Sequence, residues 1–143
     1  MKIHLITIGK PNLPYAVDGW AEYTKRLGHF HQVRVTHLPD KQNNPKNILA
    51  AAEGSNIVAL VIDGPQLNSP ELAQFLDKQA QLGKEVSFII GGPEGLPPEV
   101  IAAAQTRLSF SKLTFPHDLA MVVLAEALYR ASTINAGLPY HRA

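Results

Sequence analysis

The chain has 143 residues, of which 45% are hydrophobic and 17% charged, and its formal net charge is +1. This length fits a single domain over residues 1–143, and the composition is that of a folded globular protein rather than a disordered one. The absence of cysteine excludes disulfides and thiol-based sites and suits a cytoplasmic location, and no apolar run approaches the about 20 residues of a membrane span. We therefore expect no membrane partner.

The first half of the chain alternates between strand and helix patterns. Residues 2–9 and 32–38 have the apolar spacing of strands, and the second of these alternates so regularly that one side of it should be exposed. Residues 13–27 repeat apolar side chains at helical spacing before Gly28. Pro45 is suited to the first position of a short helix, which we expect to run through residue 52.

The second half continues the alternation. Residues 56–62 contain an uninterrupted apolar run from Ile57 to Ile62, which is typical of a strand buried on both sides in a parallel sheet. We expect further strands at residues 86–90 and near 107–111, and helices at residues 69–82, with Ser69 as N-cap, 98–104 and 117–136. Repeated strand–helix units of this kind predict an α/β fold, a single sheet with helices on both faces.

The expected last helix is apolar around most of its circumference. Glu126 and Arg130 are its main polar exceptions between residues 121 and 134. A helix of this kind must be covered on more than one side, and in a chain this small a second subunit is a natural cover. The alternative is a central helix in a monomer.

A glycine-rich loop follows the strand at residues 86–90. The sequence Gly91-Gly92-Pro93-Glu94-Gly95 should lie at the carboxyl end of the sheet, where open α/β folds bind ligands. It matches neither a dinucleotide fingerprint nor a P-loop. We interpret it as a loop that binds a ligand through backbone groups, and a plain tight turn is the alternative.

Two further segments carry polar groups suited to chemistry. Residues 111–116 join the last strand to the last helix and could present backbone groups to a ligand, and His117 follows them. The C-terminal Tyr140-His141-Arg142 combines groups that stack on bases, move protons and hold phosphates, although a solvated tail would look the same. Basic residues are in excess at both ends of the chain, which fits either an anionic partner or ordinary surface charge.

Taken together, these motifs resemble those of a known family. The glycine loop with Leu96, residues 109–117, the segment Leu124-Ala125-Glu126-Ala127-Leu128-Tyr129-Arg130-Ala131 and the terminal Pro139-Tyr140-His141-Arg142 are similar in kind and order to those of the ribosomal RNA large subunit methyltransferase H family. The opening strand and the segment Tyr23-Thr24-Lys25-Arg26 are similar too. The resemblance covers essentially the whole chain.

The resemblance implies a SPOUT-class sheet whose C-terminal part is threaded as a trefoil knot. It implies a cytoplasmic homodimer that uses S-adenosylmethionine to methylate N3 of a pseudouridine in helix 69 of large-subunit ribosomal RNA, within assembled ribosomes. By the same resemblance the cofactor is bound by Leu60, Gly92, Ser111, Lys112, Leu113, Thr114, Phe115 and Pro116. Tyr140, His141 and Arg142 are expected at the methyl-transfer centre, either within one chain or across the dimer interface.

The expected chemistry needs few ionisable groups. A sulfonium methyl is already activated, so alignment is the main requirement, and His141 is the nearest base for the N3 proton. Arg142 could stabilise a developing oxyanion or hold a phosphate. No histidine has zinc-like spacing with an acid, so we expect no metal. The competing interpretation is a non-catalytic nucleotide-binding or ribosome-associated module; a small hydrolase ranks last because no nucleophile is evident.

Overall fold

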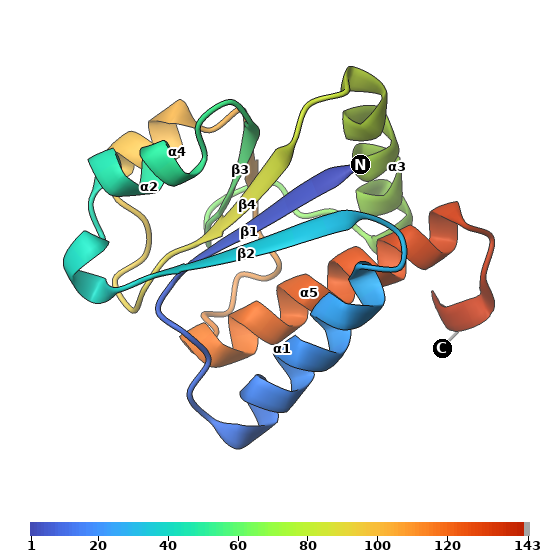
Figure 1. Cartoon of the computed structure of the whole chain (residues 1–143), viewed down its shortest axis with the longest axis horizontal. Coiled ribbons are helices and arrows are strands. Elements are labelled where there is room, and N and C mark those ends of the chain that lie inside the picture. The colour runs from blue at the N-terminus through green and yellow to red at the C-terminus, as the bar shows by residue number, and fades with distance from the viewer. Residues whose placement is uncertain (142–143) are drawn as a thin grey trace.

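The computed structural model describes residues 1–141 of the chain (Figure 1). Its strands are β1 (Lys2–Ile8), β2 (Gln32–Leu38), β3 (Asn56–Leu60), β4 (Val86–Ile90) and β5 (Thr106–Leu108). Its α-helices are α1 (Pro14–Leu27), α2 (Pro45–Ala51), α3 (Ser69–Leu82), α4 (Pro98–Ala103) and α5 (His117–Asn135), and two short 3-10 helices are η1 (Asp40–Gln42) and η2 (Pro139–His141).

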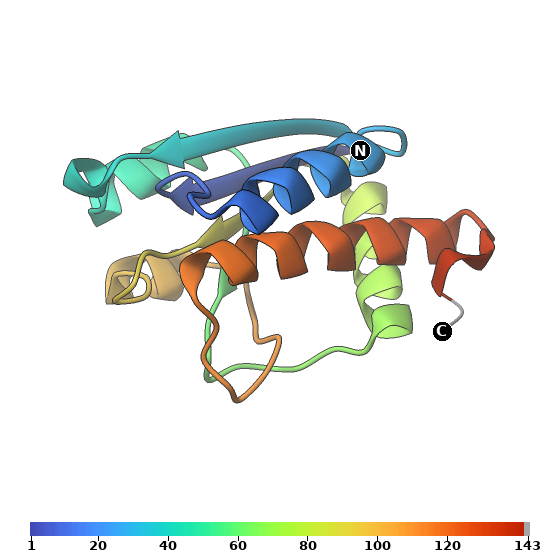
Figure 2. The same cartoon turned by 90° about the horizontal axis from the view of Figure 1, so that it is seen from below.

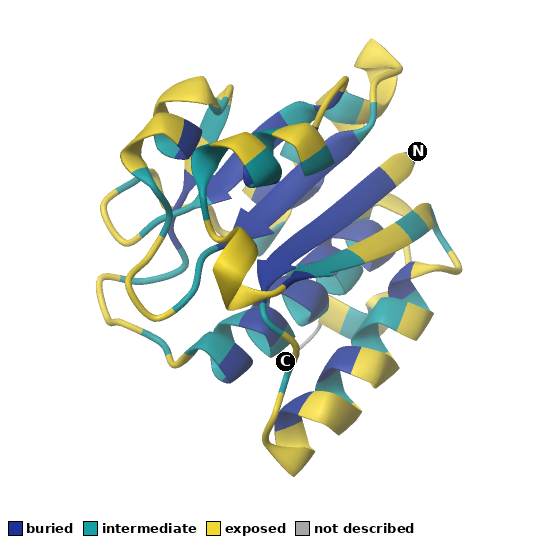
Figure 3. Cartoon of the chain, turned by 60° about the vertical axis from the view of Figure 1, so that its left-hand side comes forward, coloured by how far each residue is buried: buried dark blue, intermediate teal, exposed yellow. Residues whose placement is uncertain are grey.

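All five strands pair in parallel in one sheet of order β2-β1-β4-β3-β5. In the register of β1, Ile6 pairs with Ile89 of β4 on one side and with Thr36 of β2 on the other. The central strands are buried along their length, whereas β2, at the edge, is largely exposed (Figure 3). The expected α/β sheet is confirmed. The regular alternation expected for β2 is absent, because Val35 is exposed and Leu38, on the opposite side of the strand, is buried.

Helices cover the two faces of the sheet in separate groups. Helices α1, α3 and α5 lie on one face, while α2 and α4 lie on the other (Figures 1 and 2). Helices α1, α3 and α5 pack on a core that includes Leu5, Phe88 and Leu124. Helices α2 and α4 pack on a smaller core that includes Ile48 and Val100. The prediction of helices on both faces is therefore correct.

The central position of β1 requires its polar side chains to find partners inside the sheet layers. His4 and Thr7 are both buried. The His4 Nε2 atom lies 2.7 Å from Thr36 Oγ1, and the Thr7 hydroxyl donates to Gly9 O at 2.7 Å while lying 2.6 Å from His37 Nδ1. Buried polar groups with hydrogen-bond partners are tolerated in a core, so these histidines have structural explanations.

Several element boundaries differ from the expectation. Strand β3 ends at Leu60 rather than residue 62, and β5 ends at Leu108 rather than residue 111. The ladder between the two strands stops there, and the segments that follow them are joined by one isolated bridge between Gln66 and Ser109. The N-cap of α3 is Asn68 rather than Ser69. Asn68 and Glu71 form a capping box in which each side chain accepts the other residue's backbone N–H at 2.8 Å.

Helix α5 packs against both α1 and α3 (Figure 2). Met121, Leu124 and Leu128 point into the core and are fully buried. Val122 and Val123 remain partly exposed. Neighbouring helices of the same chain therefore cover part of the apolar circumference that the sequence predicts, and part of it stays open. Within residues 1–141, no helix is long and apolar enough to cross a membrane.

Candidate functional site

A cavity of about 550 Å³ lies at the carboxyl ends of β3, β4 and β5. Its walls come from the segments that follow these three strands and from Ala120 in the first turn of α5. Parallel strands leave their carboxyl ends together at one edge of the sheet, which is where open α/β folds bind ligands. A volume of this size falls within the usual range of small-molecule sites.

Most of the side chains that the sequence assigns to a cofactor meet in this cavity. The residues of that set that line it are Leu60, Gly92, Ser111, Leu113, Thr114 and Phe115. Lys112 and Pro116 belong to the same segment but are exposed outside the lining. The assignment of Lys112 and Pro116 to the cofactor stays a prediction, since the backbone of the segment they share with the lining residues can still reach a ligand.

The glycine loop is a tight turn and a cavity wall at the same time. The Gly95 N–H donates to Gly92 O at 2.9 Å across Pro93 and Glu94, and Gly95 has a φ of +80°, which favours glycine. A Cβ at Gly91 would lie 2.5 Å from the Gly95 carbonyl carbon, so this position admits no side chain without opening the turn. At Gly92 a Cβ would make only ordinary contact with Ile8 at 3.5 Å.

The segment from 109 to 116 is held by its own hydrogen bonds and by the segment after β3. The Ser109 N–H donates to Pro65 O at 2.9 Å, and the Ser109 hydroxyl donates to Ser111 O at 3.0 Å. The Ser111 hydroxyl accepts the Leu113 N–H at 3.0 Å. Leu113 leaves 74% of its surface exposed at the cavity rim, an unusual fraction for so large an apolar side chain.

The chemical character of the cavity is mixed. Apolar walls come from Leu60, Ile90 and Phe110, and charged groups at the same cavity come from Asp63, Glu94 and Arg107. Apolar walls with a few polar groups suit a flat heteroaromatic ring that carries a charged substituent. The described residues, 1–141, contain no group of three or more potential metal ligands.

Asp118 fixes the helix end beside the cavity, a role that the sequence did not suggest. Its Oδ2 atom accepts the backbone N–H groups of Asn12 at 2.8 Å and Leu13 at 2.7 Å. These bonds, with the Leu13 N–H contributing most, lower the pKa of the Asp118 carboxyl. His117 Nδ1 lies 3.4 Å from the other carboxylate oxygen. The sequence signal, an acid in the first turn of a helix, indicates only a favourable dipole interaction.

The described part of the tail lies elsewhere. Tyr140 packs against α5 between Glu126 and Arg130, and none of the described tail residues lines the cavity. Arg130 is ten residues beyond Ala120, a distance of about 15 Å along the helix axis. In Figure 2 the tail emerges at the far end of α5 from the cavity segments. One chain thus keeps His141 apart from the cavity, and Arg142 lies outside the described residues.

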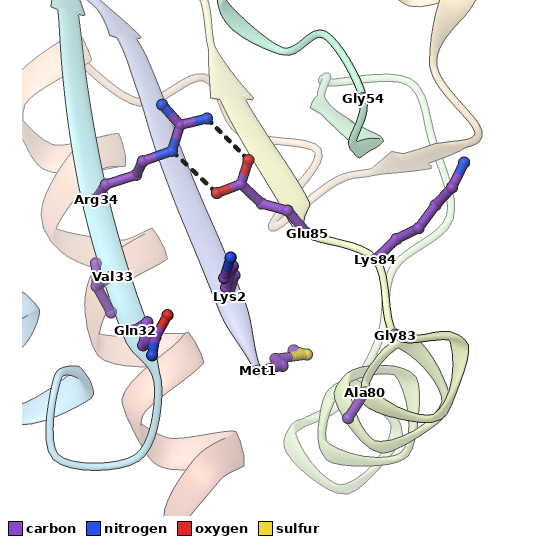
Figure 4. A pocket seen from close by; sticks show the side chains of 10 residues that line it. All are labelled: Met1, Lys2, Gln32, Val33, Arg34, Gly54, Ala80, Gly83, Lys84 and Glu85. Carbon is purple, nitrogen blue, oxygen red and sulfur yellow. Dashed lines mark hydrogen bonds and ion pairs between the residues drawn. The ribbon is translucent and has the colours of Figure 1, made fainter.

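A larger cavity of about 770 Å³ lies at the opposite edge of the sheet, near the amino ends of β1, β2 and β4. Figure 4 shows the Arg34 guanidinium paired with Glu85 there, through Nε at 2.9 Å and Nη2 at 2.8 Å. That pairing lowers the pKa of Glu85. The position at the amino ends of the strands and the satisfied ion pair both argue that this hollow is a surface feature rather than the principal site.

Comparison with known proteins gives whole-chain matches. The family described as "Predicted SPOUT methyltransferase" matches residues 1–141. The protein named "Ribosomal RNA large subunit methyltransferase H" from Deinococcus deserti is 48% identical over 145 residues, covering 99% of this chain and 100% of the relative.

Solved structures share the fold at low sequence identity. A probable methylase family protein from Haemophilus influenzae superposes with a TM-score of 0.64 at 11% identity, covering 99% of this chain and 70% of that one. The SpoU methyltransferase AviRb from Streptomyces viridochromogenes, solved with the cofactor AdoMet, gives a TM-score of 0.55 at 13% identity, covering 96% and 58%.

Proposed function

The chain belongs to the SPOUT methyltransferases and, within them, to the ribosomal RNA large subunit methyltransferase H family. We propose that it methylates N3 of a pseudouridine in helix 69 of large-subunit ribosomal RNA. Its methyl donor is S-adenosylmethionine and its substrate is the assembled ribosome, so it works in the cytoplasm. The observation that carries the proposal is the cavity at the carboxyl edge of the sheet, where six of the eight cofactor residues expected from the sequence converge.

The residues of this cavity fit S-adenosylmethionine. The apolar walls formed by Leu60, Ile90 and Phe110 suit the adenine ring, and the backbone of the glycine loop can approach a ligand closely because Gly91 and Gly92 carry no side chain. Asp63 at the same cavity suits the cationic end of the cofactor. When bound, the cofactor supplies a methyl group that is already activated on a sulfonium.

The proposed enzyme is a homodimer with a knotted C-terminal part. The trefoil threading is what the family resemblance implies, and the bond between Ser109 and Pro65 places the segment after β5 against the segment after β3. The separation of His141 from the cavity within one chain supports a site completed by the tail of a second subunit. The apolar surface that α5 leaves open at Val122 and Val123 is available to that subunit.

The tail residues carry the chemistry of the substrate side. His141 removes the proton from N3 of the base, whose lone pair is unavailable while the proton is in place. Arg142 stabilises the negative charge that develops on the neighbouring carbonyl oxygen, or holds a phosphate. Tyr140 brings both of them toward the partner's cavity.

Methyl transfer to ribosomes tests this function directly. The protein is incubated with labelled S-adenosylmethionine and ribosomes from a strain that lacks the corresponding methyltransferase, and the RNA is digested to nucleosides. We expect one new product, N3-methylpseudouridine, from helix 69. Calorimetry should show binding of S-adenosylmethionine and none of ATP. ATP binding without methyl transfer would support the non-catalytic nucleotide-binding module instead.

A further inference from the structure

The segment 124–131 presents three polar side chains on one face of α5. Glu126, Tyr129 and Arg130 are spaced by three and four residues, so they lie together on the helix surface. Leu124 and Leu128 of the same segment are fully buried in the core. The polar face therefore points away from the core, and nothing in the cofactor cavity accounts for it.

The chain end folds back onto this face. Gly137, with a φ of +73°, ends α5 in the left-handed conformation, and the Leu138 N–H donates to Thr133 O at 2.9 Å. The reversal brings η2 alongside the last turns of α5 (Figure 2). As a result Tyr140 lies against a residue that precedes it by 14 positions, Glu126.

Tyr140 is held there by three different interactions. Its hydroxyl donates to Glu126 Oε2 at 2.9 Å, its ring meets the Tyr129 ring edge to face at 4.6 Å between centroids, and the Arg130 guanidinium lies 5.1 Å from its ring centroid. Arg130 also pairs with Glu126 at 3.0 Å and donates to His141 O at 3.5 Å. Burial and the neighbouring Glu126 raise the pKa of Tyr140, so its hydroxyl remains a donor near neutral pH.

Helix α1 closes the other side of this arrangement. The Tyr23 ring lies 6.2 Å from the Tyr129 ring, and the Arg26 guanidinium lies 5.6 Å from the first and 5.5 Å from the second. Arg26 is itself paired with Glu22 at 2.6 Å. The α1 segment that resembles the family at residues 23–26 therefore converges on the same place as the α5 segment and the tail.

We propose that Glu126, Tyr129 and Arg130 are positioning residues that anchor the tail through Tyr140 and thereby fix where His141 lies during methyl transfer. The inference rests on the proposed function, because it gives the anchored tail a purpose in that reaction. An isolated tail of a few residues would sample many conformations, and a catalytic group attached to it would seldom be aligned. An anchor on the residue immediately before His141 removes most of that freedom.

The test compares Glu126→Ala, Tyr140→Phe and the double variant with a matched control, Asp77→Ala. The control removes an exposed carboxylate on α3 that accepts from Gln81 four residues further on, with the same spacing as the Glu126–Arg130 pair but no contact with the tail or its anchor. Each protein is measured for hydrogen exchange at residues 138–141, for affinity for S-adenosylmethionine, and for kcat and KM on ribosomes.

We expect Glu126→Ala and Tyr140→Phe each to speed exchange in the tail and lower kcat by about 10- to 100-fold. Cofactor affinity should stay unchanged, since the cavity is remote. The double variant should be no worse than the poorer single variant, because both changes break the same bond. The control should behave as wild type. A merely structural role would instead weaken cofactor binding along with kcat.

Two results would overturn the inference while leaving the proposed function intact: wild-type kcat in Glu126→Ala, or losses that add up in the double variant. A wild-type protein that transfers no methyl group to ribosomes would overturn the proposed function, and this inference with it.

Discussion

The Asp118 carboxylate accepts the backbone N–H of Leu13 at 2.7 Å, and so joins the start of the last helix to the loop that precedes α1. Asp118→Ala would leave this N–H and that of Asn12 without their acceptor. We expect the free energy of unfolding to fall by about 1–3 kcal/mol. Urea unfolding followed by the fluorescence of Trp20, the chain's one tryptophan, measures it.

Asp118→Asn keeps one acceptor oxygen and should cost less than the alanine variant. Asp18→Ala removes an exposed carboxylate from α1 and serves as the control, with an expected change within about 0.5 kcal/mol. Equal stability of Asp118→Ala and wild type would show that these bonds add nothing to the fold.

The two adjacent glycines of the cavity loop should respond differently to the same change. At Gly91 an added methyl would meet the Gly95 backbone at 2.5 Å, whereas at Gly92 it would meet Ile8 at 3.5 Å. Gly91→Ala should therefore open the turn and abolish binding of S-adenosylmethionine in calorimetry. Gly92→Ala should retain the fold and most of the affinity. Unchanged affinity in Gly91→Ala would remove this turn from the cofactor site.

Stability should fall as the pH drops below about 6.5, since the histidines of the unfolded chain then take up protons while burial keeps three of them neutral in the folded protein. Burial lowers the pKa of His31 from 6.5 to about 4, and it is also the main cause of the lowered pKa values of His4 and His37. Between pH 6.5 and about pH 4, His31 of the unfolded chain binds a proton that His31 of the folded chain does not, so acid favours unfolding. The stabilisation is complete above pH 6.5 and is lost toward pH 4.

For His31 alone we expect a loss of about 2 kcal/mol between pH 7 and pH 4, a value reduced for its partial exposure. Urea unfolding at several pH values measures the slope. His31→Gln retains a polar side chain that can reach Ser132 and should flatten the slope. If the unfolding free energy of His31→Gln depended on pH as steeply as that of wild type, the loss of stability in acid would not come from His31.

The tail variants separate charge stabilisation from proton removal. Arg142→Ala should reduce methyl transfer by about 30- to 1,000-fold, corresponding to roughly 2–4 kcal/mol, while cofactor affinity is retained. His141→Ala should show a defect that shrinks as the pH rises, if the imidazole removes the N3 proton. A defect independent of pH would mean that His141 orients the base. Full activity of Arg142→Ala would exclude the catalytic role of the tail.

Local patterns were sufficient for the fold but not for the exact strand ends. Periodicity identified all five strands and all five α-helices, because apolar spacing records which face of each element is buried. It extended β3 and β5 by two or three residues, since it cannot detect where hydrogen-bonded pairing stops. It missed η1, whose three residues are too few to show a period.

The site was only partly predictable for a related reason. The residues of segment 111–116 were expected to act together, but only Ser111 and residues 113–115 line the cavity, and a loop has no sequence period that would single out Lys112 and Pro116. Asp118 gave only the weak signal of an acid in the first turn of a helix, since its partners Asn12 and Leu13 are more than 100 positions away in the chain. Likewise no local sequence pattern predicts the hydrogen bond from the Tyr140 hydroxyl to Glu126.

The shared site is the central claim, and a heterodimer tests it most directly. Light scattering should first give a dimer of about twice the 15.6 kDa chain mass. Subunits carrying Gly91→Ala and Arg142→Ala, with different tags, are then co-expressed and purified as the mixed dimer. If each site combines the cavity of one subunit with the tail of the other, the mixed dimer keeps one intact site and should have about half of wild-type activity. Both homodimers should be inactive. A mixed dimer as inactive as its parents would contradict the shared site.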